Sequence, residues 1–280
     1  MTIKIGINGF GRIGRLALRA AWDRHDYEIV QINEVAGDAS AAAHLLKYDS
    51  VHGTWQKEIS GTSGADARLC IDGQWIAYTQ NQNIADTDWS AVDMVVECTG
   101  TFKSQQALAP YFDQGVKRVV VSAPVKDGTL NVVMGVNDHL YSNQAIVTAA
   151  SCTTNCLAPV VDVLQKTFGI KHAAITTIHD ITNTQSILDE YHSDLRRSRA
   201  SGMSLIPTST GSATAITEIF PELKGRINGL AVRVPLANAS LTDCVFELDG
   251  EVTVDQVNDA LRDAAQGRLQ GILGFSDLPL

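Results

Sequence analysis

The sequence predicts an α/β fold in two parts: a doubly wound parallel sheet, followed by an α+β domain with a largely antiparallel sheet. Three observations carry this prediction. The chain has 280 residues, which is more than one ordinary domain core needs. Short β-branched runs alternate with helical stretches over residues 1–150, and apolar–polar alternation follows in residues 151–280. We therefore expect a first domain at 1–150 and a second at 151–280.

The first part of the chain has the alternation of strands and helices that builds a parallel sheet. A turn signal at Asp72-Gly73 predicts a hairpin within Ala67–Tyr78. The other expected strands are Ile3–Asn8, Glu28–Asn33, Met94–Glu97, Arg118–Val121 and Ala145–Thr148, and the expected helices are Ile13–Trp22 and Ser40–Leu46.

The second part of the chain contains a long polar stretch, Thr182–Ser204, without clear periodicity. An irregular stretch of that length inside a compact domain is usually functional. Around it we expect helices at Cys156–Thr167 and near Ser212–Phe220, a strand at Ala173–His179, and alternating strands at Asn228–Val234 and Ala239–Glu247.

Composition and charge narrow the classes of function. A net charge of −9 gives no electrostatic reason to bind nucleic acid, so an anionic small molecule would need a local cationic pocket. Five cysteines without regular spacing argue against a disulfide framework. The sequence shows neither a basic segment followed by an apolar leader nor an apolar run of membrane length. We therefore expect a cytoplasmic protein.

Gly9, Gly11 and Gly14 form a GxGxxG pattern that follows an expected strand and opens an expected helix. The glycines let the backbone approach a pyrophosphate, and Arg12 and Ile13 offer backbone N–H groups at the helix N-terminus. A glycine turn in some other α/β protein is the alternative. The order of strand, glycines and helix favours a Rossmann-type domain.

Glu34 stands at the end of the second expected strand. A carboxylate at that place accepts hydrogen bonds from a ribose 2′-hydroxyl and repels a 2′-phosphate. A surface glutamate without a ligand is the alternative interpretation. Together with the glycine pattern, Glu34 predicts NAD as the cofactor.

Cys152 precedes an apolar helical run, so its thiol is expected at or just before a helix N-terminus, where the dipole stabilises a thiolate. The alternative is a small buried hydrophobe. We give that role to the cysteines in strand-like contexts, Cys70, Cys98 and Cys244. His179 ends an expected strand and by itself suits a structural role as well as a catalytic one. Cys156, one helical turn after Cys152, adds too few ligands for a structural zinc, so we expect no metal.

The segment around Cys152 resembles the active-site motif of the glyceraldehyde-3-phosphate dehydrogenase family, and the resemblance covers essentially the whole chain. The similar segments, in the family's order, are Asn8–Arg15, Lys47–Gly53, Glu97–Gly100, Ala150–Asn155, Asp194–Arg197, Pro207–Gly211 and Arg233–Pro235.

This resemblance implies an NAD-dependent oxidation of glyceraldehyde 3-phosphate to 1,3-bisphosphoglycerate. In the family's reaction Cys152 would add to the aldehyde, His179 would act as its base, and inorganic phosphate would attack the resulting thioester. The resemblance also implies a homotetramer in which the Thr182–Ser204 stretch lies near a neighbouring subunit.

Further site residues are implied by the same resemblance. Thr99 and Ser122 correspond to residues near the nicotinamide and its ribose. Without the resemblance, Thr208–Gly211 would equally suit a helix-capping turn. In the same way, a solvated basic surface would explain Arg196, Arg197 and Arg199. The family's phosphate-binding positions correspond to Ser151, Thr153, Thr182, Arg197, Thr210, Gly211 and Arg233.

The sequence also departs from the family's pattern. Glu34 stands where family members usually have aspartate, and Thr184 where aspartate is common. The resemblance ends at Leu280, where family members continue into another strand and a closing helix that carries a cofactor contact. A chain that ended there is expected to be less stable and less active than a complete homologue.

Three alternative functions stay open from the sequence. The segment Asn33–Asp38 suggests a specialised paralogue in arsenate resistance, in which arsenate replaces phosphate as acceptor. Erythrose 4-phosphate is a second candidate aldehyde. From another class, the chain is also compatible with a catalytically weak or silent NAD-binding protein, although the Cys152 and His179 pair argues against this.

Overall fold

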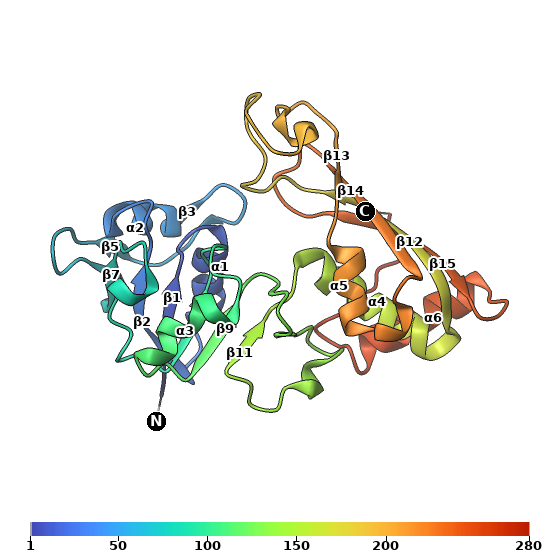
Figure 1. Ribbon diagram of the computed structural model, residues 1–280, viewed down its shortest axis with the longest axis horizontal. Helices are drawn as coiled ribbons and strands as arrows, with labels where there is room; N and C mark the ends of the chain where they lie inside the picture. The colour runs from blue at the N-terminus through green and yellow to red at the C-terminus, as the bar shows by residue number, and fades with distance from the viewer. Residues whose placement is uncertain (1, 280) are drawn as a thin grey trace. The chain divides into compact units, whose positions relative to one another are not determined.

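The chain divides into two compact units in a computed structural model that describes residues 2–279, except for the side chains of residues 212 and 213. Unit 1 comprises Met1–Val132 and Tyr141–Ala150, and unit 2 comprises Val133–Leu140 and Ser151–Leu280 (Figure 1). The short Val133–Leu140 segment groups with unit 2, so the chain crosses between the units more than once.

Unit 1 is built on one large sheet with the strand order β10-β11-β9-β8-β1-β2-β7-β6-β5. Neighbouring strands from β10 to β7 are parallel, and β6 and β5 add antiparallel strands at one edge. The predicted doubly wound parallel sheet is therefore confirmed. Its strands are β1 (Ile3–Asn8), β2 (Tyr27–Asn33), β5 (Ile59–Gly61), β6 (Arg68–Ile71), β7 (Gln74–Thr79), β8 (Met94–Glu97), β9 (Arg118–Val121), β10 (Leu130–Asn131) and β11 (Ile146–Thr148).

The predicted hairpin is confirmed as the antiparallel pair β6 and β7. Asp72 and Gly73 at its tip have φ angles of 49° and 85°. Two positive φ angles in succession are what a tight hairpin turn requires, and aspartate and glycine adopt them most easily.

The helices of unit 1 are α1 (Arg12–Ala21), α2 (Ala39–Lys47) and α3 (Gln105–Asp113), together with a short 3-10 helix, η1 (Ile84–Asp86). A small separate sheet joins β3 (Tyr48–Asp49) to β4 (Gly53–Thr54). Side chains such as Ile7, Leu18 and Leu46 are almost fully buried between sheet and helices. This core fixes the carboxyl ends of β1 and β2, near which the residues predicted to bind the cofactor lie.

Unit 2 contains a mixed sheet with the strand order β13-β14-β12-β15. Its strands are β12 (Ile170–His179), β13 (Ile206–Ser209), β14 (Ile227–Arg233) and β15 (Leu241–Leu248). Both β13 with β14 and β12 with β15 are antiparallel, as the sequence predicted. The central pair, β12 with β14, is parallel, and its register places His179 opposite Arg233.

The helices of unit 2 are α4 (Cys152–Phe168), α5 (Ser212–Ile219) and α6 (Val254–Gln266), with short 3-10 helices η2 (Asp138–Leu140), η3 (Leu195–Ser198) and η4 (Pro221–Leu223). Helix α6 packs on α4 through Val163, Ala264 and Leu269. Between β12 and β13 the chain is irregular apart from η3, as expected for Thr182–Ser204. None of the helices within residues 2–279 is long and apolar enough to cross a membrane.

Candidate active site

The glycine loop between β1 and α1 has the backbone geometry that its sequence predicts. Gly9 has a φ angle of 85°, and a Cβ atom there would lie 2.5 Å from the backbone nitrogen of Thr99. A Cβ atom on Gly14 would lie 2.1 Å from the carbonyl oxygen of Gly9. At Gly11, the N-cap residue of α1, a Cβ atom would meet nothing within 4 Å. Gly9 and Gly14 are therefore required by the fold itself, whereas Gly11 leaves space free beside the helix N-terminus.

Glu34 is tied to this loop by backbone hydrogen bonds. Phe10 N–H donates to Glu34 Oε2 at 2.6 Å, and Ala36 N–H donates to Oε1 at 2.9 Å. The longer side chain of glutamate reaches back across the end of β2 and holds the carboxylate against the loop. Arg12 pairs with Asp49 at 3.0 Å, and the side chain of Ile13 is 56% exposed.

Thr99 and Ser122 lie at the carboxyl ends of β8 and β9 and both contact Glu97. Thr99 donates from its backbone N–H and from Oγ1 to Glu97 Oε1, at 2.8 and 2.5 Å. Ser122 N–H donates to the carbonyl oxygen of Glu97 at 2.9 Å. The other carboxylate oxygen of Glu97 accepts from Tyr111 Oη at 2.7 Å and from Asn8 Nδ2 at 3.0 Å. Sequence reasoning missed this buried network.

The burial of the Glu97 side chain changes the pKa of its carboxyl group. Its side chain is almost fully buried, and this burial raises the pKa of the carboxyl group. Hydrogen bonds from Thr99 and Tyr111 partly oppose that shift. A buried acid that is fully hydrogen-bonded fixes the backbone of Thr99 beside the glycine loop.

Cys152 is the first residue of α4, so the helix begins four residues earlier than the expected Cys156–Thr167. The difference has a local cause. Ser151 is the N-cap residue, and its hydroxyl accepts a hydrogen bond from Thr154 N–H. The threonine-rich turn lacks the apolar periodicity from which a helix is read, but a serine cap supplies the start signal instead.

The thiol of Cys152 lies beside the imidazole of His179, with 3.5 Å between Sγ and Nε2. The contact with His179 lowers the pKa of Cys152, against the effect of partial burial. The same contact raises the pKa of His179, since a thiolate stabilises the imidazolium. Because Cys152 is solvent-exposed and His179 is buried, a substrate can approach the sulfur while the ring stays fixed.

The other ring nitrogen of His179, Nδ1, has three polar neighbours. Asp180 Oδ1 lies at 2.6 Å, the carbonyl oxygen of Asp180 at 2.9 Å, and Arg233 Nη1 at 2.8 Å. Of these residues, Arg233 was predicted from the sequence, whereas Asp180 was not. The signal that could have identified Asp180 is its position in the sequence, because this carboxylate directly follows the candidate base at the end of a strand.

Several residues expected to bind phosphate are joined by hydrogen bonds. Arg197 donates from Nη1 to Thr184 Oγ1 at 3.2 Å and from Nε to Thr208 Oγ1 at 3.0 Å. Thr184 also contacts the hydroxyl of Thr182 at 3.0 Å. The positive charge of Arg197 lowers the pKa of Arg233, after the larger effect of burial. Two guanidinium groups and neighbouring hydroxyls thus share one locality, which favours an anion.

The remaining expected residues lie at helix starts. Thr153, almost fully buried, has its hydroxyl 4.0 Å from Cys152 Sγ. Gly211 is the N-cap residue of α5, and Thr210 directly precedes it after β13.

Cys70, Cys98 and Cys244, which were predicted to be small buried hydrophobic residues, differ from Cys152 in their surroundings. Cys70 is buried, and burial raises the pKa of Cys98 and of Cys244 to about 11. By contrast, the contact with His179 lowers the pKa of Cys152. Within residues 2–279 no three His, Cys, Asp or Glu side chains cluster in a way that could hold a metal ion.

Comparison with known proteins matches both parts of the chain. Residues 3–105 match the model of the "glyceraldehyde 3-phosphate dehydrogenase, NAD binding domain", and residues 151–280 match the "glyceraldehyde 3-phosphate dehydrogenase, C-terminal domain". These ranges contain the glycine loop and the Cys152–His179 pair, respectively.

Curated relatives agree over the full length of this chain. A "glyceraldehyde-3-phosphate dehydrogenase 3" of Nostoc sp. is 56% identical, over 100% of this chain and 84% of its own length. A "glyceraldehyde-3-phosphate dehydrogenase 1" of Bacillus cereus is 50% identical, over 99% of this chain and 83% of its own. A plasmid-encoded glyceraldehyde-3-phosphate dehydrogenase of Cupriavidus necator is 45% identical, over 100% and 84%. With two domain models and relatives of this similarity, the chain belongs to the glyceraldehyde-3-phosphate dehydrogenase family.

Proposed function

We propose that this chain catalyses the NAD-dependent oxidation of glyceraldehyde 3-phosphate, with inorganic phosphate, to 1,3-bisphosphoglycerate. The observation that carries the proposal is the pair formed by Cys152 at the first residue of α4 and His179 at the end of β12, with 3.5 Å between Sγ and Nε2. A thiol with a lowered pKa beside a basic ring is the arrangement that covalent aldehyde chemistry needs.

Cys152 and His179 share the covalent steps. The Cys152 thiolate forms a bond to the aldehyde carbon, and the His179 imidazolium gives its Nε2 proton to the carbonyl oxygen, which yields a hemithioacetal. His179 Nε2 then accepts that hydroxyl proton as the carbon is oxidised to a thioester. A phosphate oxygen attacks the thioester carbon, and the Cys152 thiolate leaves. The backbone N–H of Cys152, in the first turn of α4, is suited to stabilise the oxyanion.

The anionic groups of the reaction require cationic and hydroxyl partners. Arg233 and Arg197 supply the positive charge, and Arg233 also lies against the base at 2.8 Å. We propose that the hydroxyls and helix starts of Ser151, Thr153, Thr182, Thr210 and Gly211 complete the phosphate-binding set.

The residues around the glycine loop fit NAD. The N-terminus of α1 has no side-chain cap, and the space beside Gly11 is free of protein atoms, which suits a pyrophosphate. The fixed carboxylate of Glu34 is suited to bind the adenosine ribose. Thr99 and Ser122 are suited to contact the nicotinamide and its ribose. Arg12 and Ile13 would present backbone N–H groups. When bound, NAD supplies the acceptor for the hydride of the hemithioacetal.

The first experiment measures NADH formation from glyceraldehyde 3-phosphate and NAD, with phosphate, with arsenate and with neither. Wild type and Cys152→Ser are compared, and Cys244→Ser serves as the control for loss of a thiol. We expect turnover that requires Cys152 and an oxyanion and that survives the loss of Cys244. Turnover retained by Cys152→Ser would reject the proposed nucleophile.

The same assay separates the alternative functions. A preference for arsenate over phosphate would favour an arsenate-resistance paralogue, and faster turnover of erythrose 4-phosphate would favour that aldehyde. Binding of NAD without any turnover would favour a silent NAD-binding protein.

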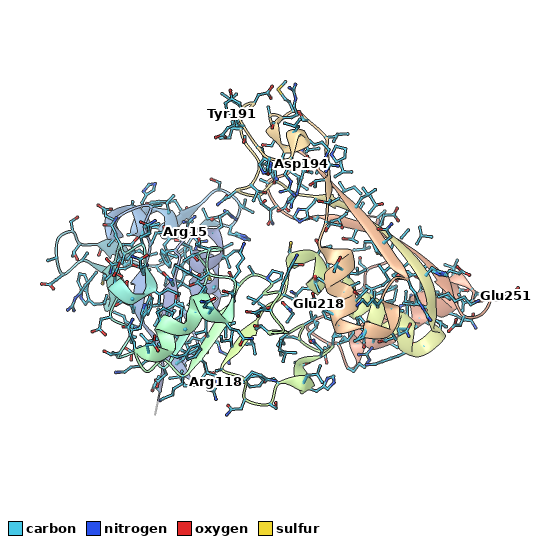
Figure 2. All side chains as sticks on the ribbon, viewed as in Figure 1. Arg15, Arg118, Tyr191, Asp194, Glu218 and Glu251 are labelled. Atoms are coloured by element: carbon cyan, nitrogen blue, oxygen red, sulfur yellow. The ribbon has the colours of Figure 1, made fainter. Side chains whose placement is uncertain are left out.

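We also propose a cytoplasmic homotetramer that acts on small phosphorylated molecules. Exposed apolar side chains on the segment between β12 and β13 support an assembly. The exposed fractions are 86% for Ile187, 76% for Leu188 and 104% for Tyr191. Figure 2 shows Tyr191 at the outer end of this segment. Light scattering on the purified chain would measure its oligomeric state.

A further inference from the structure

His179 Nδ1 has more polar neighbours than one nitrogen can bond. Asp180 Oδ1 lies at 2.6 Å and can only accept a hydrogen bond when ionised, whereas Arg233 Nη1 lies at 2.8 Å and can only donate one. If Nδ1 carries a proton, it donates to Asp180. If Nδ1 is bare, it accepts from Arg233. The carboxylate and the guanidinium therefore favour opposite protonation states of the same ring.

The surroundings favour the protonated nitrogen. Arg233 Nη1 has a second acceptor, the carbonyl oxygen of Asp180 at 2.8 Å, so it keeps a hydrogen bond when Nδ1 carries a proton. The Asp180 carboxylate, at 2.6 Å, is the nearest of the neighbours of Nδ1. A proton on Nδ1 thus leaves neither Arg233 nor Asp180 without a partner.

Asp180 is itself held in place by a residue distant in the chain. Its backbone N–H donates to Ser240 Oγ at 3.1 Å, and Ser240 Oγ donates to Asp180 Oδ1 at 3.3 Å. Ser240 directly precedes β15, the strand that pairs with β12 on the side away from β14. The carboxylate is thus fixed from both neighbouring strands of β12, by Arg233 through the backbone and by Ser240 through the side chain.

We propose that Asp180 is a positioning residue that completes a Cys152–His179–Asp180 chain. It accepts a hydrogen bond from Nδ1–H of His179, turns Nε2 toward Cys152 Sγ, and stabilises the imidazolium that accompanies the thiolate. The proposal rests on the proposed function, because it assigns a role at the same site. No covalent bond to Asp180 is involved, and no proton is transferred to it.

The charged groups that face His179 have opposing effects. Cys152 on α4, as a thiolate, and the backbone carbonyl of Asp180 after β12 both favour the imidazolium, whereas Arg233 on β14 opposes it, with Arg197 near Arg233. The Asp180 carboxylate, 2.6 Å from Nδ1, adds a second negative charge that offsets the guanidinium beside the ring. Since a charge within about 4–6 Å shifts a pKa by about 1–3 units, the carboxylate is close enough to decide the protonation of the pair.

The test is the pH dependence of Cys152 alkylation in Asp180→Asn. The asparagine keeps the shape and can still contact Ser240, but it carries no charge. Iodoacetate is an anion, so removing a charge near the arginines would by itself change how fast it reaches Cys152. Iodoacetamide is neutral and avoids this effect. We expect the acidic limb of the rate profile to move to higher pH by about one unit, and alkylation on that limb to slow about tenfold.

Two further variants serve as controls. Asp189→Asn removes one charge from unit 2 at a carboxylate that pairs with Arg199, and its profile should match wild type. Ser240→Ala keeps the carboxylate but removes its anchor, so it should move the limb in the same direction by less. If Asp180→Asn does not fold, the Ser240→Ala profile decides the question.

An Asp180→Asn profile that superimposes on that of wild type would overturn the proposal. So would a uniform loss of rate at all pH values, because a merely structural role lowers the rate without moving the limb. The measurement needs no substrate and no NAD. A shifted limb in a protein without turnover would therefore support Asp180 while rejecting the proposed function.

Discussion

The starts of α1 and α4, one in each unit, use the same physical feature in opposite ways. Both helices present backbone N–H groups and the positive end of the dipole. Helix α1 begins after Gly11, which provides no side-chain cap, whereas α4 begins after Ser151, whose hydroxyl caps Thr154 N–H. The first start has no side-chain cap, whereas the second is capped and has Cys152 as its first residue.

The charges around the two starts match this difference. At α1, Arg12 is paired with Asp49, and Arg15 donates to the carbonyl oxygen of Phe10 in the loop. At α4, Cys152 lies beside a histidine whose pKa is raised, so the charge arises within the protein. At α1 no side-chain cap occupies the helix start, whereas at α4 a cap satisfies one N–H and a neighbouring histidine supplies the charge.

The largest effect is expected from a pair of glycine substitutions at the open start. Gly14→Ala puts a Cβ atom 2.1 Å from Gly9 O, so unit 1 should lose about 3 kcal/mol or more of stability. Gly11→Ala meets no protein atom within 4 Å, so the fold should keep its melting temperature while NAD binding weakens at least tenfold. Calorimetry and fluorescence titration measure the two effects. Equal NAD affinity in Gly11→Ala and wild type would contradict an open anion site at α1.

The next largest effect is expected from removing the histidine beside Cys152 at the capped start of α4. His179→Asn should raise the pKa of Cys152 toward its ordinary value, because the contact with His179 is the main cause of its lowering. The thiolate fraction near neutral pH should then fall about tenfold or more, and iodoacetamide labelling with it. His172→Asn, on an exposed histidine that pairs with Glu247, is the matched control. Unchanged labelling of His179→Asn would mean that the dipole of α4 alone maintains the thiolate.

Removing the cap itself should have a smaller effect. Ser151→Ala leaves Thr154 N–H without the hydroxyl acceptor, which should cost about 1 kcal/mol of unfolding free energy. Urea denaturation measures this cost. Ser151→Asp should restore most of it, since aspartate also caps helices. A stability of Ser151→Ala equal to wild type would mean that the two helix starts do not differ in capping energy.

The smallest effect is a pH-dependent one at α1. Backbone hydrogen bonds from His52 and Val51, together with Arg12, lower the pKa of Asp49 from 3.8 to about 2. A lowered pKa in the folded state means that stability is present above about pH 4 and is lost as the pH falls toward 2. Asp49→Asn should therefore be less stable than wild type near neutral pH, by under about 1 kcal/mol, and the gap should close in acid. If the difference in stability between Asp49→Asn and wild type grew as the pH fell, the predicted direction of the pH dependence would be wrong.

The sequence predicted those elements whose signals are local. Strands such as Met94–Glu97 and the turn at Asp72-Gly73 depend on residues next to one another, and they were found at or near their true bounds. Helix α3 was missed because Pro110 interrupts its pattern, although Ser104 supplies a side-chain cap. Helix α6 was missed as well, despite the capping box of Thr253 and Gln256.

The site was predictable where residue type and spacing carry chemistry, and not where partners meet through the fold. Cys152 and His179 were singled out as candidates, but their 3.5 Å contact joins a helix start to a strand end. The link between Asp180 and Ser240 spans 60 residues, and that between Asn8 and Glu97 spans 89. Nothing in a linear pattern predicts such pairs, because they depend on strand order.

The in-register pairing of β12 with β14 limits how the length of this chain can vary. His179 and Arg233 face each other because Ala173 and Ile227 start the same parallel ladder. Successive side chains of a strand point to opposite faces, so inserting or deleting one residue in either strand would turn Arg233 away from the ring. Length variation among descendants of this sequence should therefore spare the two strands.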